Sequence, residues 1–404
     1  MMTLDEKFKA IGADNAPGQE GRQKIDNLDS MMRGEKIAGV LVDFSHGDVD
    51  AFAPTPGSDA LWMQGYQKGA AQAYTQYRGS AEIAQGLAER LGAFTGRAIA
   101  ADSELIITPG TQGALFLALG ALVGADTKVA VIAPDYFANR KIVTYLGGIV
   151  VPIPLHYGKG QSQNGPDLEA LERAFKEGVE VLVFSTPNNP TGVIYSKESI
   201  NKIATLARQY DVSVIVDQLY SRLLYSGESY THLRACESVP KNIITIMGPS
   251  KTESLSGFRL GVAFGSAALI ERMERLQAIV SLRAAGYNQA VLSGWLDETP
   301  GWLQERIQKH EAIRDDLLEI FNTAGLITAK PQAGSYLFPK LPPLDVDITL
   351  FVRLLRHQAG VIVTPGSEFG PTTHDSVRLN FSQDHDNAVA AAKRIVSMVQ
   401  RYKK

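Results

Sequence analysis

The sequence predicts an α/β fold, with a large domain whose mainly parallel sheet is covered by helices on both faces and a smaller α+β domain. Between residues 104 and 266, seven short apolar runs alternate with amphipathic stretches of helical length. Most of these runs are apolar throughout, which is typical of strands buried on both faces. From Thr299 onward, a long charged amphipathic stretch is followed by short strand-like segments, which favours a separate α+β unit.

The runs of the predicted sheet are rich in Val and Ile, and each has the length of one strand. They are residues 105–108, 129–134, 149–155, 181–185, 212–217, 243–247 and 260–264. In the smaller domain, we expect a helix over residues 302–324 and strands over residues 335–339, 360–363 and 377–381.

The chain of 404 residues is longer than one ordinary core supports, so we expect two domains. The predicted boundaries are 1–54 for an N-terminal segment, 55–298 for the large domain and 299–404 for the small one. The N-terminal segment is polar and loop-like, and we expect it to pack on the small domain or on a partner subunit.

Composition argues against several classes of function. A net charge of −3 gives no electrostatic reason to expect nucleic acid or an anionic membrane as partner. No run approaches the roughly 20 apolar residues that span a bilayer, and the first residues show no apolar leader, so we expect a cytoplasmic protein. The single Cys236 predicts neither an intrachain disulfide nor a metal site.

The loops at the carboxyl ends of the strands are the expected place for a ligand in such a sheet. After the first run, Gly110, Thr111 and Gln112 form a turn that opens a helix, where free backbone N–H groups can bind an anion such as phosphate. An ordinary turn explains the glycine equally well. After the fourth run, prolines and a glycine fix the backbone around a pair of amides that includes Asn189.

Two further loops carry ionisable groups directly after buried strands. Asp217 ends the fifth run, where a carboxylate is costly unless it meets a cation or a strong donor, and Tyr220 follows three residues later. Ser250 and Lys251 follow the sixth run, where desolvation lowers the pKa of an amine toward the range that imine formation needs.

Four short motifs follow one another along the chain: Asn-Pro-Thr-Gly, Asp-x-x-Tyr, Ser-Lys with an arginine eight residues later, and a distal arginine before an asparagine. In this order they resemble the class I/II aminotransferase family of fold-type I pyridoxal-phosphate enzymes. The similarity runs from Tyr74 to Arg378 and so covers most of the chain. It implies pyridoxal 5'-phosphate as the cofactor.

The resemblance also implies roles for individual residues. Lys251 would bind the cofactor as a Schiff base and then move the proton between the substrate and the cofactor. Asp217 would keep the pyridine nitrogen protonated, and Asn189 and Tyr220 would bond the ring oxygen.

The remaining cofactor contacts implied by the family lie around the phosphate and the ring. Tyr136 would stack on the ring, although a core tyrosine is the other interpretation. Tyr74 would reach the phosphate of the neighbouring subunit, which implies a homodimer with shared active sites. The phosphate itself would meet Gly110, Thr111, Gln112, Ser250 and Arg259.

For the substrate, the resemblance implies that Arg378 forks onto the α-carboxylate. His46 and Gly47 replace part of the pattern Gly-Glu-Pro common in relatives, so His46 would face the substrate, unless it is an exposed loop histidine. Arg283 would bind a distal carboxylate of the substrate or the phosphate of the cofactor, unless it is a plain helix-end arginine. Gly248 stands where many relatives carry a phosphate-binding serine.

The predicted reaction is a ping-pong transfer of an amino group between an α-amino acid and a 2-oxo acid such as pyruvate or 2-oxoglutarate. The same scaffold supports other reactions, so a lyase remains the alternative, either a carbon–sulfur β-lyase or an aminocyclopropane-carboxylate-synthase-like enzyme. A non-catalytic ligand sensor is disfavoured because Lys251 is present and there is no basic, DNA-binding extension.

Overall fold

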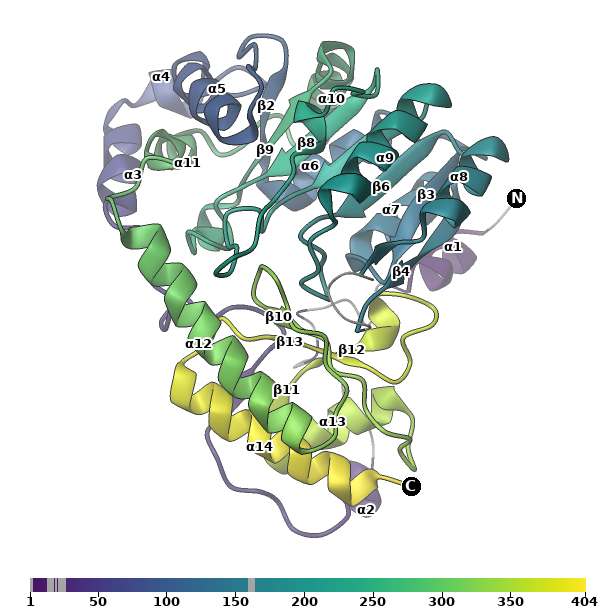
Figure 1. The fold of residues 1–404 in the computed structure, drawn as a ribbon. Coiled ribbons are helices and arrows are strands. Elements are labelled where there is room, and N and C mark those ends of the chain that lie inside the picture. Colours follow the sequence, from purple (N-terminus) through teal and green to yellow (C-terminus); the bar gives the residue numbers. More distant parts are fainter. Residues whose placement is uncertain (1–2, 13–17, 19, 21–26, 159–163) are drawn as a thin grey trace.

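The structure, a computed structural model, describes residues 3–12, 18, 20, 27–158 and 164–404. Its largest feature is an eight-stranded sheet with the strand order β2-β9-β8-β7-β6-β3-β4-β5 (Figure 1). These strands are β2 (Leu105–Pro109), β3 (Lys128–Ala133), β4 (Ile149–His156), β5 (Gly165–Pro166), β6 (Val181–Ser185), β7 (Ser213–Asp217), β8 (Ile243–Met247) and β9 (Leu260–Gly265). Seven of them match the seven apolar runs of the sequence.

The sheet is mainly parallel, as predicted. Strands β3, β4, β6, β7 and β8 pair in parallel, whereas β9 is antiparallel to β2 and β8. The register places Ser185 beside Asp217 and Asp217 beside Ile246. The loops that follow β6, β7 and β8 therefore leave the sheet at the same edge.

Helices cover both faces of the sheet (Figure 1). Alternate residues of a strand belong to different cores: Leu182 packs with α8 and α9, and Val183 packs with α6 and α10. This alternation explains the continuously apolar runs, because a strand covered on both sides buries every residue. The helices are α5 (Ala81–Thr95), α6 (Gly110–Gly120), α7 (Phe137–Leu146), α8 (Leu168–Lys176), α9 (Lys197–Gln209) and α10 (Ala267–Val280).

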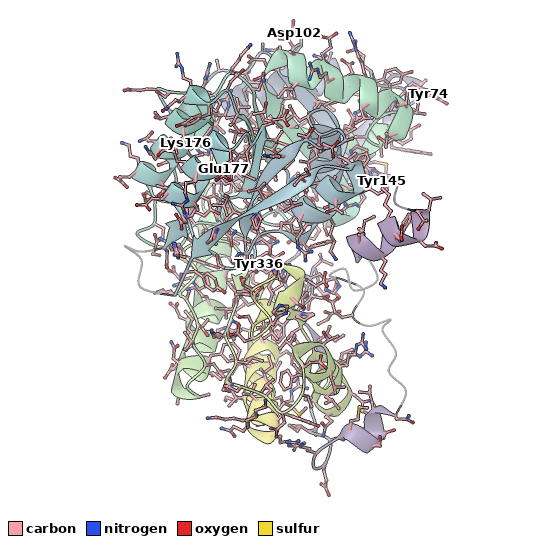
Figure 2. All side chains as sticks on the ribbon, turned by 90° about the vertical axis from the view of Figure 1, so that its right-hand side faces the viewer. Tyr74, Asp102, Tyr145, Lys176, Glu177 and Tyr336 are labelled. Atoms are coloured by element: carbon pink, nitrogen blue, oxygen red, sulfur yellow. The ribbon has the colours of Figure 1, made fainter. Side chains whose placement is uncertain are left out.

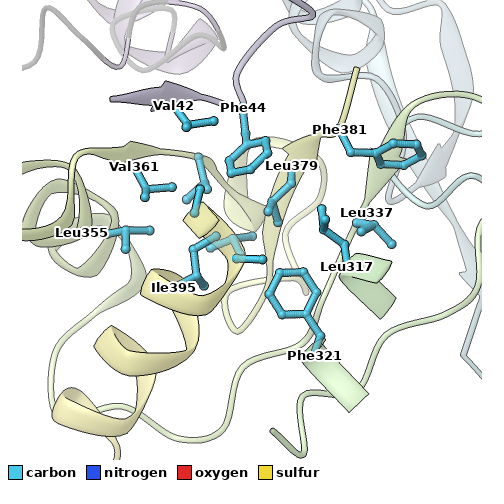
Figure 3. Close-up of a cluster of buried hydrophobic side chains, with 14 of the residues drawn as sticks. Val42, Phe44, Leu317, Phe321, Leu337, Leu355, Val361, Leu379, Phe381 and Ile395 are labelled. Carbon is cyan, nitrogen blue, oxygen red and sulfur yellow. The ribbon is translucent and has the colours of Figure 1, made fainter. Parts of the chain in front are cut away.

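A smaller α+β part lies below the carboxyl edge of the sheet (Figure 1). The cluster of Figure 3, which includes Phe44, Phe321, Leu379 and Ile395, forms its core. Its helices are α12 (Trp302–Thr323), α13 (Ile348–Ala359) and α14 (His385–Tyr402). Its strands are β10 (Tyr336–Leu337), β13 (Val377–Asn380) and β12 (Thr364–Pro365) in one sheet, and β1 (Val42–Asp43) with β11 (Val361–Ile362) in another.

The N-terminal segment differs from the expected loop because it contains the helix α1 (Leu4–Ile11). Thr3 caps this helix through a capping box with Glu6, and the helix contacts α7 of the large sheet. Further along, β1 pairs with β11 of the smaller part. Residues 1–2, 13–17, 19 and 21–26 of this segment lie outside the described residues.

The remaining helices are short or lie at one end of the sheet. They are α2 (Leu28–Met31), α3 (Ser58–Gln67), α4 (Ala70–Ala73) and α11 (Gly286–Gln289), with 3-10 turns at Leu233–Ala235, Ser256–Phe258, Ala290–Gly294 and Gly366–Glu368. Among the described residues, no helix has the length and apolar composition needed to cross a membrane.

Candidate active site

A cavity of about 230 Å³ opens where the carboxyl ends of β6, β7 and β8 face the smaller part of the molecule. Eleven of the fifteen predicted site residues line it: His46, Thr111, Gln112, Tyr136, Asn189, Asp217, Tyr220, Ser250, Lys251, Arg259 and Arg378. This is the edge at which open α/β sheets bind their ligands.

Four predicted residues do not line the cavity. Gly110 lies directly behind it, since a Cβ at this position would be 2.8 Å from Nη2 of Arg259. Gly47 borders a neighbouring shallow pocket together with His46. Tyr74 and Arg283 lie elsewhere, with the Arg283 guanidinium 5.7 Å from the centre of the largely exposed Tyr74 ring.

Asp217 carries a carboxylate without a cationic partner among the described residues. Its Oδ1 accepts one hydrogen bond, 3.0 Å from the backbone N–H of Leu219. Burial raises the pKa of Asp217 to about 6, and the bond from Leu219 opposes this rise only in part. The site therefore favours a cationic or strongly donating group that would enter the cavity beside Asp217.

An anion-binding cradle forms the other side of the cavity. Helix α6 begins at Gly110, and no side chain caps its first N–H groups. Gly110 adopts φ +78°, and a Cβ on Gly261 would come within 2.4 Å of the Gly110–Thr111 backbone, so β9 packs closely under the start of the helix. Arg259 adds a positive charge beside these groups, and this combination suits a phosphate.

The walls between these two ends carry hydrogen-bonding side chains. The Tyr136 hydroxyl donates to Oε1 of Gln112 at 2.8 Å, and burial raises the pKa of Tyr136 above its usual range. Asn189 is held by its backbone N–H, which donates to Oγ of Ser185 at 3.1 Å. The hydroxyl oxygens of Tyr220 and Tyr336 are 2.7 Å apart.

Arg378 enters the cavity from β13, where it pairs with Thr364 of β12. Its guanidinium donates to the carbonyl oxygen of Ser45 at 2.9 Å, and it has no carboxylate partner among the described residues. The rings of Tyr336 and Phe369 lie 4.5 and 4.7 Å from its Cζ. The buried Nε has no hydrogen-bond partner in the described part of the chain. This guanidinium can therefore receive a carboxylate.

The sequence prediction did not include several residues in or beside this site, and Asp135, which adjoins the lining residue Tyr136 without lining the cavity itself, is the clearest example. Its carboxylate is buried and accepts hydrogen bonds from the backbone N–H of Ser185 at 2.8 Å and of Tyr136 at 2.6 Å. Burial holds the pKa of Asp135 well above its ordinary value. The signal was available, because Asp135, like Asp217, is a carboxylate placed next to an apolar strand. Ser45 and Tyr336 line the cavity itself without having been predicted.

Comparisons with known proteins agree with this geometry. The family model described as aminotransferase class I and II matches residues 41–395. The aspartate/prephenate aminotransferase of Thermus thermophilus is 28% identical over 368 residues, which are 89% of this chain and 91% of that protein. The probable aspartate/prephenate aminotransferase of Thermus aquaticus is 29% identical over 398 residues, 98% of this chain and 97% of that one.

Solved structures extend the similarity to three dimensions. A crystal structure of an aspartate aminotransferase from Rhodobacter sphaeroides 2.4.1 is 58% identical and covers 100% of both chains with a TM-score of 0.95. An aspartate aminotransferase from Thermus thermophilus, solved with maleate, is 25% identical with a TM-score of 0.83 and covers 98% of this chain and 100% of that one.

The sheet and its cavity define a fold-type I enzyme that depends on pyridoxal 5'-phosphate. The chain belongs to the aminotransferase class I and II family, and it is an aminotransferase that acts on amino acids and 2-oxo acids. Its cavity fits the cofactor, because the unpaired Asp217 suits a protonated ring nitrogen and the start of α6 with Arg259 suits a phosphate. When bound, the cofactor supplies an electron sink for the bond electrons released at the substrate Cα.

Proposed function

We propose that Lys251 bonds the cofactor and carries the proton to and from the substrate Cα, while Arg378 holds the substrate α-carboxylate. One observation carries this proposal: Lys251, Asp217 and Arg378 line the same cavity, although they come from three distant segments. An amino acid and a 2-oxo acid both carry this carboxylate, so the same arginine serves the two half-reactions of a ping-pong cycle.

The other contacts follow from the positions of the groups. Asn189 and Tyr220 would donate to the ring oxygen, and Tyr136 would stack on the ring. Gly110, Thr111, Gln112, Ser250 and Arg259 would hold the phosphate. Two observations support this phosphate site: the uncapped start of α6 and the guanidinium of Arg259 beside it.

We further propose that the active unit is a homodimer. Tyr74, which Figure 2 labels at the outer edge of the molecule, is one of several large exposed side chains that come from α3, from α10 and from the segments that follow α4 and α10. Arg283 lies between the rings of Tyr74 and Tyr77, with its Cζ 5.7 and 5.4 Å from their centres. A subunit contact that brings Tyr74 to the phosphate of a neighbouring subunit would also bring Arg283 close to the active site of that subunit. The exposed residues are Met63, Tyr66, Tyr74, Tyr77, Ile279, Val280 and Leu282.

For the substrate, we propose a dicarboxylic amino acid such as aspartate, with 2-oxoglutarate as acceptor in preference to pyruvate. The partner's Arg283 would bind the distal carboxylate, and His46 and Gly47 would border the same pocket. The aspartate aminotransferase names of the similar structures support this choice, as does the maleate in one of them, since maleate is also a dicarboxylate.

The domain limits 1–54, 55–298 and 299–404 stay part of the proposal. A core built mainly from residues 313–402, to which Val42, Phe44 and Phe52 and, from the larger part, Tyr225 contribute, supports them. A cytoplasmic location is also proposed, and the presence of a single cysteine fits a reducing compartment.

The absorption spectrum between 300 and 500 nm, recorded with single amino acids and no 2-oxo acid, tests the reaction. We expect a band in the visible range that one amino acid converts into the band of pyridoxamine phosphate. Release of ammonia or another leaving group instead would support the lyase alternative. The Lys251→Ala variant should lose this conversion, with turnover at least about a thousandfold lower, and a fully active variant would refute the assignment.

The substrate and dimer proposals are tested together. Arg283→Met should raise KM for aspartate roughly tenfold or more and leave KM for alanine within about twofold. An equal change for both substrates would argue against distal-carboxylate binding. Sedimentation at micromolar concentration should give twice the chain mass, and a monomer with full activity would contradict the shared site.

A further inference from the structure

Asp135 is a buried acid just beyond the carboxyl end of β3, and the proposed function gives it no role. The pairing of β3 with β6 ends at Val131 and Val183. Two residues further along β6, the backbone N–H of Ser185 donates to Oδ2 of Asp135 at 2.8 Å. The carboxylate therefore continues the contact between the two strands beyond their last backbone pair.

The other carboxylate oxygen of Asp135 connects two residues of the cavity wall. Oδ1 accepts the backbone N–H of Tyr136 at 2.6 Å and also the hydroxyl of Ser185. The Ser185 oxygen in turn accepts the backbone N–H of Asn189 at 3.1 Å. A hydroxyl donates one proton and accepts through its lone pairs, so Ser185 makes both bonds at once. Tyr136 and Asn189 are thereby tied to one carboxylate, although they lie in different loops.

We propose that Asp135 is a positioning residue that holds Tyr136 and Asn189 in a fixed relation to each other. The inference rests on the proposed function, in which Tyr136 stacks on the cofactor ring and Asn189 donates to the ring oxygen. One carboxylate would then set both the contact on the ring face and the contact on the ring edge. Asp135 does not line the cavity, so it acts through these two residues.

The burial of this network favours a single arrangement of its members. Asp135 is 2% exposed, Ser185 is 3% exposed and Asn189 is 6% exposed. A buried N–H group without an acceptor loses its bond to water and gains nothing in return. The N–H groups of Ser185 and Asn189 are satisfied together only when the carboxylate and the hydroxyl are both in place, which restricts the loop that follows β6.

The backbone of Asp135 is held by a separate contact with the smaller part of the molecule. Its N–H donates to the carbonyl oxygen of Phe369 at 3.0 Å, and the Phe369 ring lies 4.7 Å from Cζ of Arg378. This contact involves no side-chain atom of Asp135. A change of the carboxylate should therefore release Tyr136 and Asn189 while the backbone stays anchored.

The test uses two variants as holoenzymes, because they break different parts of the network. Ser185→Ala removes one oxygen atom and breaks only the link to Asn189. Asp135→Ala breaks the links to both Tyr136 and Asn189. Asn189→Ala serves as the reference for the ring-oxygen contact itself.

Ser213→Ala is the matched control. Ser213 is another buried serine of the large sheet, but it lies at the start of β7, at the opposite end from Asp217. Its Oγ accepts from Nδ2 of Asn242 at 3.3 Å, and neither residue lines the cavity. This variant therefore loses a buried hydroxyl without touching the proposed network.

Two properties of the cofactor's visible absorption band report the two links separately. A donor to the ring oxygen stabilises its anionic form and lowers the pH midpoint of the band, so this midpoint reports Asn189. The circular dichroism of the band depends on how an aromatic ring stacks against the cofactor, so it reports Tyr136. Thermal unfolding of each cofactor-free variant shows whether it is folded.

We expect Asn189→Ala to raise the midpoint by about one pH unit and Ser185→Ala to raise it by about half a unit. Asp135→Ala should raise the midpoint at least as much as Ser185→Ala does. Asp135→Ala should also roughly halve the circular dichroism, which Ser185→Ala should preserve. Ser213→Ala should change neither property.

If Asn189→Ala raises the midpoint while Ser185→Ala and Asp135→Ala leave it unchanged, the inference is overturned and the proposed function stands. Unchanged circular dichroism in Asp135→Ala, or an equal midpoint shift in Ser213→Ala, would overturn it as well. If Asn189→Ala itself has no effect, the ring-oxygen contact of the proposed function fails and the inference fails with it. If Asp135→Ala does not fold, Asp135→Asn replaces it, because it keeps the side-chain volume but turns one acceptor into a donor that faces a donor.

Discussion

Nη1 of Arg378 lies 3.3 Å from Oδ1 of Asn189, although Arg378 comes from β13 of the smaller part and Asn189 from the loop after β6. This hydrogen bond joins the proposed carboxylate site to the proposed ring site. It also fixes the orientation of the Asn189 amide, because Oδ1 accepts from Arg378 and Nδ2 is left to donate into the cavity.

Arg378→Lys should reduce kcat/KM for both the amino acid and the 2-oxo acid by about 100-fold or more. A lysine ammonium cannot fork onto a carboxylate, and it would leave Asn189 without its present donor. Steady-state kinetics with each substrate measure the loss. Arg394→Lys is the matched control, because Arg394 is also buried in the smaller part but donates to backbone carbonyls, including that of Val40 at 2.7 Å. Equal losses in both variants would mean a general loss of structure.

Asp217 should make the stability of the cofactor-free protein depend on pH. Its pKa in the folded protein is raised to about 6 from an ordinary value of 3.8, so the folded state holds the proton more tightly than the unfolded state. Relative to Asp217→Asn, the unmodified protein should lose about 3 kcal/mol of unfolding free energy as pH rises from 4 to beyond 6. Urea unfolding across this range measures the difference, and the exposed Asp59→Asn should show no such trend. A constant difference between the two proteins would contradict the assignment.

The buried pair of Arg222 and Glu253 should stabilise the Lys251 loop. Arg222 bonds Glu253 and also donates to Glu298 at 2.7 and 2.8 Å, and burial raises the pKa of Glu253 to about 7 despite Arg222. Arg222→Ala would leave two carboxylates without their cation, at a cost of about 3–5 kcal/mol in unfolding free energy. Arg33→Ala, which breaks an exposed pair with Asp345, should cost about 1 kcal/mol or less. Similar losses in the two variants would count against the buried network.

Gly248 and Thr111 should behave as a coupled pair. A Cβ at position 248 would lie 2.7 Å from Cγ2 of Thr111, so the threonine methyl group occupies the space that a serine side chain would need. Gly248→Ser should destabilise the protein by about 1–3 kcal/mol, and Thr111→Ser in the same chain should recover most of the loss, because it removes that methyl group. Thermal unfolding of the two single variants and the double variant measures the coupling. Additive effects would show that the two positions are independent.

The large sheet could be predicted closely because its strands are apolar on both faces. The run at residues 243–247 became β8 (Ile243–Met247) without a shift, since Gly248 and Pro249 follow Met247 directly and end the strand. The sequence prediction did not include the N-terminal helix α1, which has only eight residues, none of them buried. Two signals were available: Leu4, Phe8 and Ile11 recur at helical spacing, and Thr3 with Glu6 forms a capping box.

The site residues that could be predicted from local sequence are charged residues that directly follow apolar strands, such as Lys251 and Asp217. Tyr336 could not be singled out in the same way, because a tyrosine in a strand is ordinary and only the fold places it 2.7 Å from Tyr220. The distance between Arg378 and Asn189 likewise depends on how the two parts of the chain meet, which no local pattern encodes. Tyr74 and Arg283 lie outside the cavity of a single chain, so their roles stay predictions about the dimer.

The pairing of β1 with β11 also affects how the chain matures during its synthesis. Val42 leaves the ribosome long before its strand partner Val361 and the core helix α14 (His385–Tyr402) are made. The large sheet is complete once β9 has formed, while the smaller part has to wait for α14. Arg378 is made after Asp217 and Lys251, so a nascent chain can form the wall of the cavity that contains these two residues before it has the arginine on the opposite wall.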